Sequence, residues 1–347
     1  MDTIGLDLHK RESQLCIGHE DGSVEERRMV TSRERFTAVL GARGRARILL
    51  EASTESEWVA RHLESLGHEV IVADPNFAAM YATRSRRTKT DRRDARTLME
   101  ACRLGAYRPA YRVSDARRHV RAELAVREAL VRTRTRYIAV AKALVRRDGL
   151  RVAGSDAEHV AQHLAALELS AVLASELRPL VTVLAPITEQ IAAADLRIAA
   201  LTEADAAVAL LATAPSVGPI TAAAIVATLD DITRFRSAHQ VEAFLGLVPA
   251  ERSSGEKRRI GRITKAGNAR ARYLLVEAGW RLLRSRADEA AALRAWGRAI
   301  AARRGNRIAA VALARRLAGV LYAMWRDGRP YDAAKLRLPQ TRTPQAA

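Results

Sequence analysis

Two acidic residues stand at positions where short apolar segments predict buried β-strands. Asp7 falls inside the segment 3–8, and Glu51 follows the apolar run 48–50. Strand centres rarely carry Asp, and a buried carboxylate is costly unless it is paired or binds a cation. The residue types and positions of Asp7 and Glu51 therefore predict that both bind a metal ion.

A second acidic pair, Asp91 and Asp94, begins a segment whose apolar positions recur at helical spacing. Residues three apart share one face of a helix, so both carboxylates join those of Asp7 and Glu51 if this helix packs against the sheet. Oxygen ligands of this kind suit Mg²⁺ or Mn²⁺, and paired ions about 3.5–4 Å apart catalyse phosphoryl transfer. In the alternative interpretation, Asp91 and Asp94 only favour the N-terminus of their helix.

A basic, glycine-containing loop over residues 249–268 is the second candidate site. Between residues 251 and 272 there are eight basic and two acidic residues, and Ser253 and Ser254 precede a glycine. A serine that attacks phosphorus needs a base or a metal ion to activate its oxygen. The loop contains no His or Asp, so the activating groups must come from elsewhere, and the four acids are the obvious source. In the alternative interpretation, the serines only donate hydrogen bonds to a bound phosphate.

The turn Ser216-Val217-Gly218-Pro219 joins two apolar segments that predict helices. It resembles the hairpin of helix-hairpin-helix modules, in which backbone N–H groups and the N-terminus of the next helix approach a phosphate. Any helical hairpin needs a turn, so this motif is weaker evidence for nucleic-acid binding than the basic loop.

Length and charge narrow the class of protein. The 347 residues suffice for two domains or one large one, and the formal net charge is +19. Such an excess predicts a polyanionic partner, with nucleic acid as the first candidate and a membrane surface as the second. No segment approaches 18 uninterrupted apolar residues, and the N-terminus lacks a signal pattern, so we expect a cytoplasmic protein with no membrane span. Cys16 and Cys102 provide neither a disulfide framework nor a zinc set.

The first hundred residues alternate predicted strands and helices. The first three strands are joined by tight polar connections, which predicts an antiparallel meander. The predicted strands are 3–8, 14–18, 24–30, 46–51 and 69–73, and the predicted helices are 32–42, 55–66 and 91–104. This βββαβαβα order is that of an RNase H-like (RuvC-like) domain, an α/β fold.

The rest of the chain predicts helices and loops. Ala- and Leu-rich segments at 115–148, 157–175 and 180–212 favour a coiled coil or, equally, a plain helical bundle. Further helices are predicted at 240–248, 269–285 and 308–326. We therefore expect a RuvC-like domain at 1–110, a helical linker at 111–205, a small helical domain at 206–335 and a disordered tail at 336–347.

Several motifs, taken together and in this order, resemble one family. GLDLHK at 5–10, LLEAS at 49–53 and KTDRRDA at 89–95 resemble the DEDD motif of Piv-like DNA invertases and of insertion-sequence transposases of the one-ten (IS110) family. PSVGP at 215–219, SSG at 253–255 and GRITKAGN at 261–268 resemble that family's C-terminal domain. The resemblance covers nearly the whole chain. One departure, Ala271 where the family usually has Leu, is a change in packing.

The resemblance implies DNA recombination by a RuvC-like fold, a coiled-coil linker and a helical transposase domain, guided by a structured non-coding bridge RNA. Asp7, Glu51, Asp91 and Asp94 would bind Mg²⁺ or Mn²⁺. Ser254, or its neighbour Ser253, would be the nucleophile. In a homo-oligomer, a dimer or tetramer, the metal site of one subunit would meet the serine of another. The side chains expected to contact nucleic acid are Lys10, Arg87, Lys89, Arg92, Lys257, Arg258, Arg259, Arg262, Lys265, Asn268 and Arg272.

Two other function classes stay open at this point. A RuvC-like, structure-specific DNA nuclease, such as a junction resolvase, would use only the four acids and water. A non-catalytic nucleic-acid-binding protein would be expected to have a broken acid set, whereas all four acids are present here.

Overall fold

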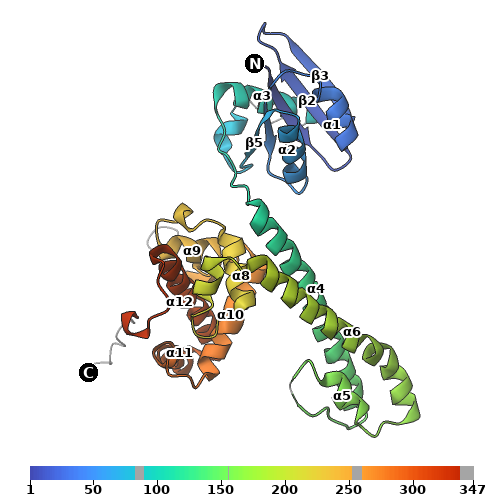
Figure 1. The fold of residues 1–347 in the computed structure, drawn as a ribbon, viewed down its shortest axis with the longest axis vertical. Coiled ribbons are helices and arrows are strands. Elements are labelled where there is room, and N and C mark those ends of the chain that lie inside the picture. Colours follow the sequence, from blue (N-terminus) through green and yellow to red (C-terminus); the bar gives the residue numbers. More distant parts are fainter. Residues whose placement is uncertain (83–89, 155, 252–259, 337–347) are drawn as a thin grey trace. The chain divides into compact units, whose positions relative to one another are not determined.

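The fold is taken from a computed structural model, which describes residues 1–82, 90–154, 156–251 and 260–336. The chain divides into two compact units, Met1–Arg112 and Val113–Ala347. The first unit is a mixed α/β structure and the second is mainly helical (Figure 1).

The first unit is built on a five-stranded sheet in the order β3-β2-β1-β4-β5. Its strands are β1 (Thr3–Leu8), β2 (Glu12–Gly18), β3 (Val24–Val30), β4 (Arg47–Glu51) and β5 (Glu69–Ala73). Strand β2 pairs antiparallel with both β1 and β3, so the predicted meander is confirmed. Strand β4 pairs parallel with β1 and with β5, which places β1 and β4 side by side in the centre.

Helices cover both faces of this sheet. Ile4 and Leu6 of β1 belong to one core with helices α1 (Arg33–Leu40) and α2 (Ser56–Ser65). Leu49 of β4 belongs to another core, with η1 (Ala78–Tyr81) and α3 (Asp91–Leu104). Successive side chains of a strand point to opposite faces. Asp7 of β1 and Glu51 of β4 therefore share the face that α3 covers, which is the arrangement that a joint metal site requires.

Helix α3 crosses β1 in close contact at Gly5. A Cβ atom at this position would lie 2.0 Å from the carbonyl oxygen of Ala95 and 2.3 Å from the backbone nitrogen of Met99. Both neighbours are backbone atoms, which cannot rotate away as a side chain can. A glycine is therefore required for this crossing, and the crossing brings the first turn of α3 towards the end of β1.

The second unit begins with two long helices, α4 (Asp115–Arg147) and α6 (Ala171–Thr202), which lie side by side (Figure 1). Their ion pairs Arg127–Asp195 and Arg147–Glu176 show that they run antiparallel, because the partner number falls as the α4 number rises. Buried residues recur every seven positions along α6, the spacing typical of coiled coils: they are Leu177, Leu184, Ile191 and Ile198.

Helix boundaries in this region differ from the prediction. The sequence predicts a break between residues 175 and 180, which is wrong, because α6 continues through Pro179 and Pro186. Both prolines are exposed, and the buried heptad positions on the opposite side keep packing against α4. The break lies instead between α5 (Val160–Ala165) and α6, and α7 (Ala206–Leu211) is a separate helix.

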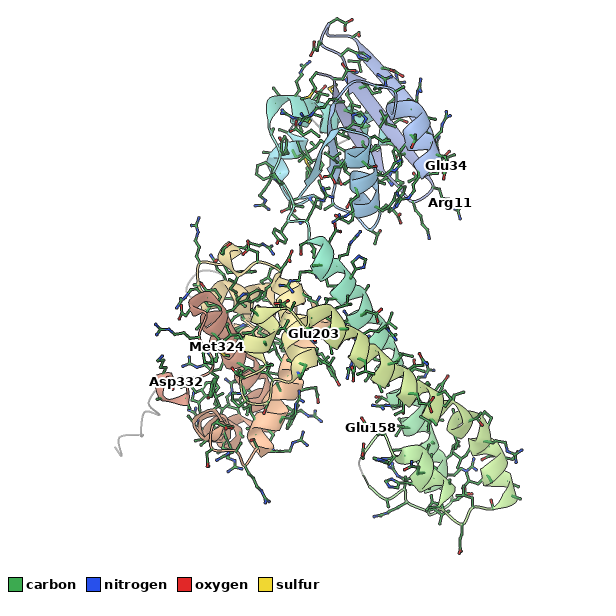
Figure 2. The ribbon with its side chains drawn as sticks, viewed as in Figure 1. Arg11, Glu34, Glu158, Glu203, Met324 and Asp332 are labelled. Carbon is green, nitrogen blue, oxygen red and sulfur yellow. The ribbon has the colours of Figure 1, made fainter. Side chains whose placement is uncertain are left out.

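The C-terminal helices form a core of their own around α8 (Pro219–Leu229), which is buried from Thr221 to Leu229. Met324 (Figure 2) is buried in the same core. The other elements are η2 (Ile232–Arg234), α9 (Ala238–Phe244), α10 (Ala269–Arg284), α11 (Ala291–Arg304), α12 (Asn306–Asp327) and η3 (Ala333–Lys335). Helix α11 was not predicted: only two of its residues are buried, one of them a glycine, so its apolar pattern is weak.

The predicted loop at 249–268 contains a short antiparallel pair, β6 (Pro249–Glu251) and β7 (Ile260–Ile263). The prediction of a loop is therefore wrong at 249–251 and 260–263. The serine segment between the strands, residues 252–259, lies outside the described residues. So does the predicted tail except for Leu336, which packs against the C-terminal core.

Two helices among the described residues, α6 and α12, are long and apolar enough to cross a membrane by length and composition alone. This is weak evidence for a membrane span, because a core helix of a soluble protein passes the same test. Half of the apolar window of α12 is buried within the unit, against 17% of the window of α6, whose buried positions pack against α4.

Candidate metal centre

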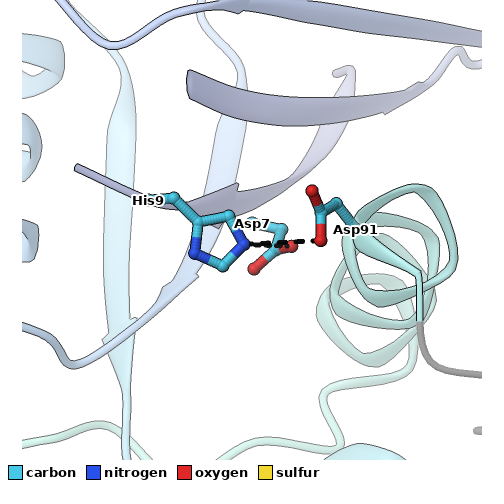
Figure 3. A group of neighbouring side chains, drawn as sticks. All are labelled: Asp7, His9 and Asp91. Carbon is cyan, nitrogen blue, oxygen red and sulfur yellow. Dashed lines mark ion pairs between the residues drawn. The ribbon is translucent and has the colours of Figure 1, made fainter. Parts of the chain in front are cut away.

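Asp7 of β1, His9 just after β1, and Asp91 at the start of α3 come together in the first unit (Figure 3). The Nε2 atom of His9 lies 3.3 Å from Oδ2 of Asp7 and 3.5 Å from Oδ1 of Asp91. The ligand atoms of all three residues lie within 4.8 Å of one another. Two predicted acids and one histidine that was not predicted therefore face a common point.

Asp7 is a largely buried carboxylate with few compensating contacts. Its side chain is only 14% exposed, and its Oδ2 atom is buried with no hydrogen-bond partner among the described residues. Burial is the largest cause that raises the pKa of Asp7, to about 6, and nearby His9 opposes the rise. The charges of Asp94, Asp91 and Glu51 raise this pKa further. The four carboxylates are thus near enough for their charges to interact, but Glu51 and Asp94 do not belong to the group whose ligand atoms lie within 4.8 Å of one another. That group, Asp7, His9 and Asp91, fits a divalent cation.

Glu51 ends β4 and is held by Tyr81, whose hydroxyl donates a hydrogen bond of 2.7 Å to Oε1. Tyr81 is the last residue of η1, on the same face of the sheet as α3. Tyr81 was not predicted from the sequence, because no local pattern links a tyrosine thirty residues downstream to this carboxylate. The bond holds one oxygen of Glu51 and restricts the rotation of its carboxylate.

Asp94 is buried and lies, like Asp91, in the first turn of α3. Thr90 caps this turn by accepting a hydrogen bond from the backbone N–H of Arg93. Because the threonine already serves as the N-cap, the helix needs neither acid as its cap. The burial of Asp94 further sets it apart from a carboxylate that only favours a helix terminus, whereas the side chain of Asp91 is 58% exposed.

His9 is the ligand-type residue that sequence analysis missed. A signal for it was present: His9 follows Asp7 by two positions, and residues two apart in an extended chain lie on the same face. The side chain of His9 is 54% exposed, so it lines the solvent side of the centre. Lys10, which was predicted to contact nucleic acid, is exposed next to it.

Comparisons with known proteins identify the family. Residues 4–147 match a model of DEDD-type IS110 transposases, and residues 208–294 match the transposase IS116/IS110/IS902 family. A Pseudomonas aeruginosa protein named "Probable family 20 transposase" is 31% identical over 287 residues, which cover 80% of this chain and 83% of that protein. The chain belongs to the IS110 transposase family.

Two further relatives extend the match along the chain. The transposase for insertion sequence element IS1111A of Coxiella burnetii is 29% identical over 92% of this chain and 88% of its own length. The transposase for insertion sequence element IS1328 of Yersinia enterocolitica is 26% identical over 94% of this chain and 97% of its own length. The protein is therefore a DNA transposase, and the DEDD name of its family agrees with a divalent-metal site.

The predicted nucleic-acid contacts of this transposase fall into three groups. Lys10, Arg92, Arg262 and Lys265 are exposed, and Arg92 forms an ion pair with Glu26. Asn268 and Arg272 hold local structure. The residues outside the described part of the chain are Arg87, Lys89, Ser253, Ser254, Lys257, Arg258 and Arg259.

Asn268 and Arg272 fix the backbone where the basic loop enters α10. The Asn268 side chain caps α10 by accepting hydrogen bonds from the N–H groups of Arg270 and Ala271. The Arg272 guanidinium donates to the carbonyl oxygens of Leu245, at 3.1 Å, and Ala266, at 3.0 Å. These contacts give both residues a role in positioning the basic loop, which is separate from their predicted role on nucleic acid.

A further basic surface, which sequence analysis missed, lies at the turn between α11 and α12. We call it the α11–α12 arginine cluster; it consists of Arg298, Arg303, Arg304 and Arg307. All four side chains are exposed, and none has an ion-pair partner within the described part of the chain. The signal was an acid-free stretch, since residues 290–326 contain no Asp or Glu.

Proposed function

We propose that this transposase cuts and rejoins DNA with a divalent-metal site at Asp7, Glu51, Asp91 and Asp94 and with Ser254 as the nucleophile. The observation that carries the metal site is the buried Oδ2 atom of Asp7, which has no hydrogen-bond partner among the described residues and lies near three other acids. A buried carboxylate without a hydrogen bond opposes folding, and the neighbouring His9, 3.3 Å away, neutralises it only when protonated. The retention of Asp7 therefore points to a ligand. The sheet order β3-β2-β1-β4-β5 supports an RNase H-like fold for this unit.

The proposed ligands come from two elements of the first unit. Asp7 and Glu51 would hold the ion from the sheet, while Asp91 and Asp94 would hold it from α3. When bound, the ion polarises a phosphate oxygen and stabilises developing negative charge. Ser254 Oγ forms a bond to phosphorus as the bond to a sugar oxygen breaks, the serine proton is released and the sugar oxygen gains one. In the second step, a sugar hydroxyl of the new strand displaces the serine.

The assembly that we propose is a homo-oligomer, a dimer or tetramer, in which the acids of one copy act with the serine of another. The serine segment contains no His or Asp to accept its proton, which supports an activating group from outside the loop. We further propose that a structured bridge RNA selects the donor and target DNA and that the protein works in the cytoplasm. The net charge of +19 supports two polyanionic partners.

A covalent intermediate tests this proposal. The full-length protein, Mg²⁺, the RNA encoded beside the element and a DNA duplex carrying the element's end are combined and denatured. We expect a protein–DNA adduct on a denaturing gel, with the DNA mapped to Ser254 by mass spectrometry. Ser254→Ala should lose the adduct and strand exchange, while Ser253→Ala should keep both. If Ser254→Ala cuts DNA at the wild-type rate and no adduct forms, the protein is a RuvC-like nuclease that uses water.

The α11–α12 arginine cluster should contribute to the salt dependence of DNA binding. Each phosphate contact adds about 0.9 to the slope of log affinity against log salt. Changing Arg303, Arg304 and Arg307 together to Ala should therefore reduce the slope by about 2 to 3. This slope is measured by fluorescence anisotropy with a labelled DNA duplex across a series of salt concentrations.

The matched control removes three arginines that are each ion-paired to a glutamate: Arg61, Arg147 and Arg197. It changes the net charge by the same amount, but should leave the salt slope nearly unchanged, because paired side chains release few counterions. Equal slopes for the two triple variants would show that the α11–α12 arginine cluster makes no phosphate contact.

A further inference from the structure

The same nitrogen atom of His9 approaches two acidic ligands. Its Nε2 lies 3.3 Å from Oδ2 of Asp7 and 3.5 Å from Oδ1 of Asp91. Despite this proximity, Oδ2 of Asp7 has no hydrogen-bond partner within the described residues. A histidine that served only to neutralise Asp7 would be expected to direct an N–H at that oxygen. The three atoms instead surround a common point (Figure 3).

The spacing matches neighbouring positions around one metal ion. Two ligand atoms that each stand about 2.1 Å from an ion, at right angles, are about 3 Å apart. The two distances from Nε2 exceed this value by half an ångström or less, so small side-chain movements would complete the coordination. The exposure of His9 leaves the solvent side of the centre open for the ion to enter.

We propose that His9 is a nitrogen ligand of the metal centre and gives it a preference for Mn²⁺-like transition ions over Mg²⁺. The inference rests on the proposed metal site at the four acids. Mg²⁺ is a hard cation that binds oxygen ligands and gives up its waters reluctantly, whereas imidazole suits transition ions. A centre made only of carboxylates has no such means of discrimination, so His9 determines the metal specificity of this site.

Electron spin-echo envelope modulation (ESEEM) spectroscopy of bound Mn²⁺ tests the proposal without any measurement of activity. The full-length protein is stripped with EDTA, loaded with less than one equivalent of Mn²⁺ and examined for ¹⁴N modulation from a coordinated imidazole. Competition with Mg²⁺ then gives the ratio of the two affinities. Four proteins are compared: the wild type and the variants His9→Gln, His19→Gln and Asp7→Asn.

The matched control is His19, which also pairs with an aspartate, at 3.0 Å from Asp2, near the other end of β1 and β2. We expect ¹⁴N modulation in the wild type and in His19→Gln, and none in His9→Gln. The preference for Mn²⁺ over Mg²⁺ should fall at least about tenfold in His9→Gln. His9 is exposed, so its replacement should leave the fold intact, which circular dichroism verifies.

The outcomes separate this inference from the proposed function. If the wild type shows no ¹⁴N modulation, or if His9→Gln retains it, His9 is not a ligand and the inference is overturned. If Asp7→Asn loses Mn²⁺ binding in that case, the acid site itself still stands. If Asp7→Asn binds Mn²⁺ as well as the wild type, the metal is held elsewhere and both the inference and the proposed metal site are overturned.

Discussion

Asp7→Asn is expected to abolish DNA cleavage and strand exchange while making the metal-free protein more stable. The amide has the same shape but no charge to hold a cation. Loss of a residue that only supports a metal ligand costs about 10–100-fold, so loss of the central carboxylate should cost at least about 100-fold in activity. DNA binding should persist, because the exposed basic side chains are unchanged.

The gain in stability follows from the sign of the pKa shift. Burial and the other acids raise the pKa of Asp7 from 3.8 to about 6 in the folded protein. Between these two values, the folded state holds a proton that the unfolded state has released, so stability falls as pH rises through this window. Above pH 6, ionised Asp7 lowers the free energy of unfolding by its full amount. A pKa shift of about two units corresponds to at most about 3 kcal/mol. Asparagine removes this cost.

Thermal unfolding in EDTA measures this effect across a pH series. Asp7→Asn should raise the melting temperature at pH 8 by a few degrees and lose that advantage below about pH 4. The matched control is Asp21→Asn, because Asp21 is exposed and its bonds to Ser23 lower its pKa; this variant should show no gain. Added Mn²⁺ should stabilise the wild type only. A lower melting temperature for Asp7→Asn in EDTA would mean that Asp7 carries no such cost.

Much of the first unit could be predicted because its signals are local. The strands and helices alternate clearly, and the tight polar connections between the first three strands predict their antiparallel meander. Asp7 and Glu51 were recognised as unusual because each stands in or beside an apolar strand. These inferences need only the neighbouring residues and the rule that side chains alternate along a strand.

The missed features depend on contacts between distant segments. Tyr81 is recognisable as a partner of Glu51 only once η1 is placed against the sheet. Gly5 resembles any strand glycine until α3 is seen to cross it. The course of α6 through two prolines depends on its packing against α4, which outweighs the local preference for a break. Tertiary packing, rather than local propensity, decides each of these cases.

Gly5→Ala is expected to disrupt the metal centre although it changes none of the acids. The added methyl group would meet the backbone of α3 at Ala95 and Met99. Overpacking of a core costs about 1–3 kcal/mol and sometimes more, and the upper part of this range applies because backbone atoms cannot change rotamer. To relieve the clash, α3 must move away from β1, and it carries Asp91 and Asp94 with it.

Two measurements on Gly5→Ala distinguish a damaged site from a merely weakened fold. The melting temperature of the metal-free protein should fall, and Mn²⁺ affinity measured well below that temperature should fall at least about tenfold. Gly44→Ala is the matched control, since no atom lies within 4 Å of its added Cβ, and its stability should stay within about 0.5 kcal/mol of the wild type.

The contrast with Asp7→Asn makes the geometric argument testable. Both changes should reduce metal binding, but Asp7→Asn should stabilise the metal-free protein and Gly5→Ala should destabilise it. These opposite effects on stability are expected only if two conditions hold. The repulsion and burial of the acids must destabilise the metal-free protein, and the arrangement of the acids must depend on the close crossing of α3 over β1. Full Mn²⁺ affinity in a destabilised Gly5→Ala protein would show that the acids of α3 reach Asp7 without that crossing, and that Gly5 serves the fold alone.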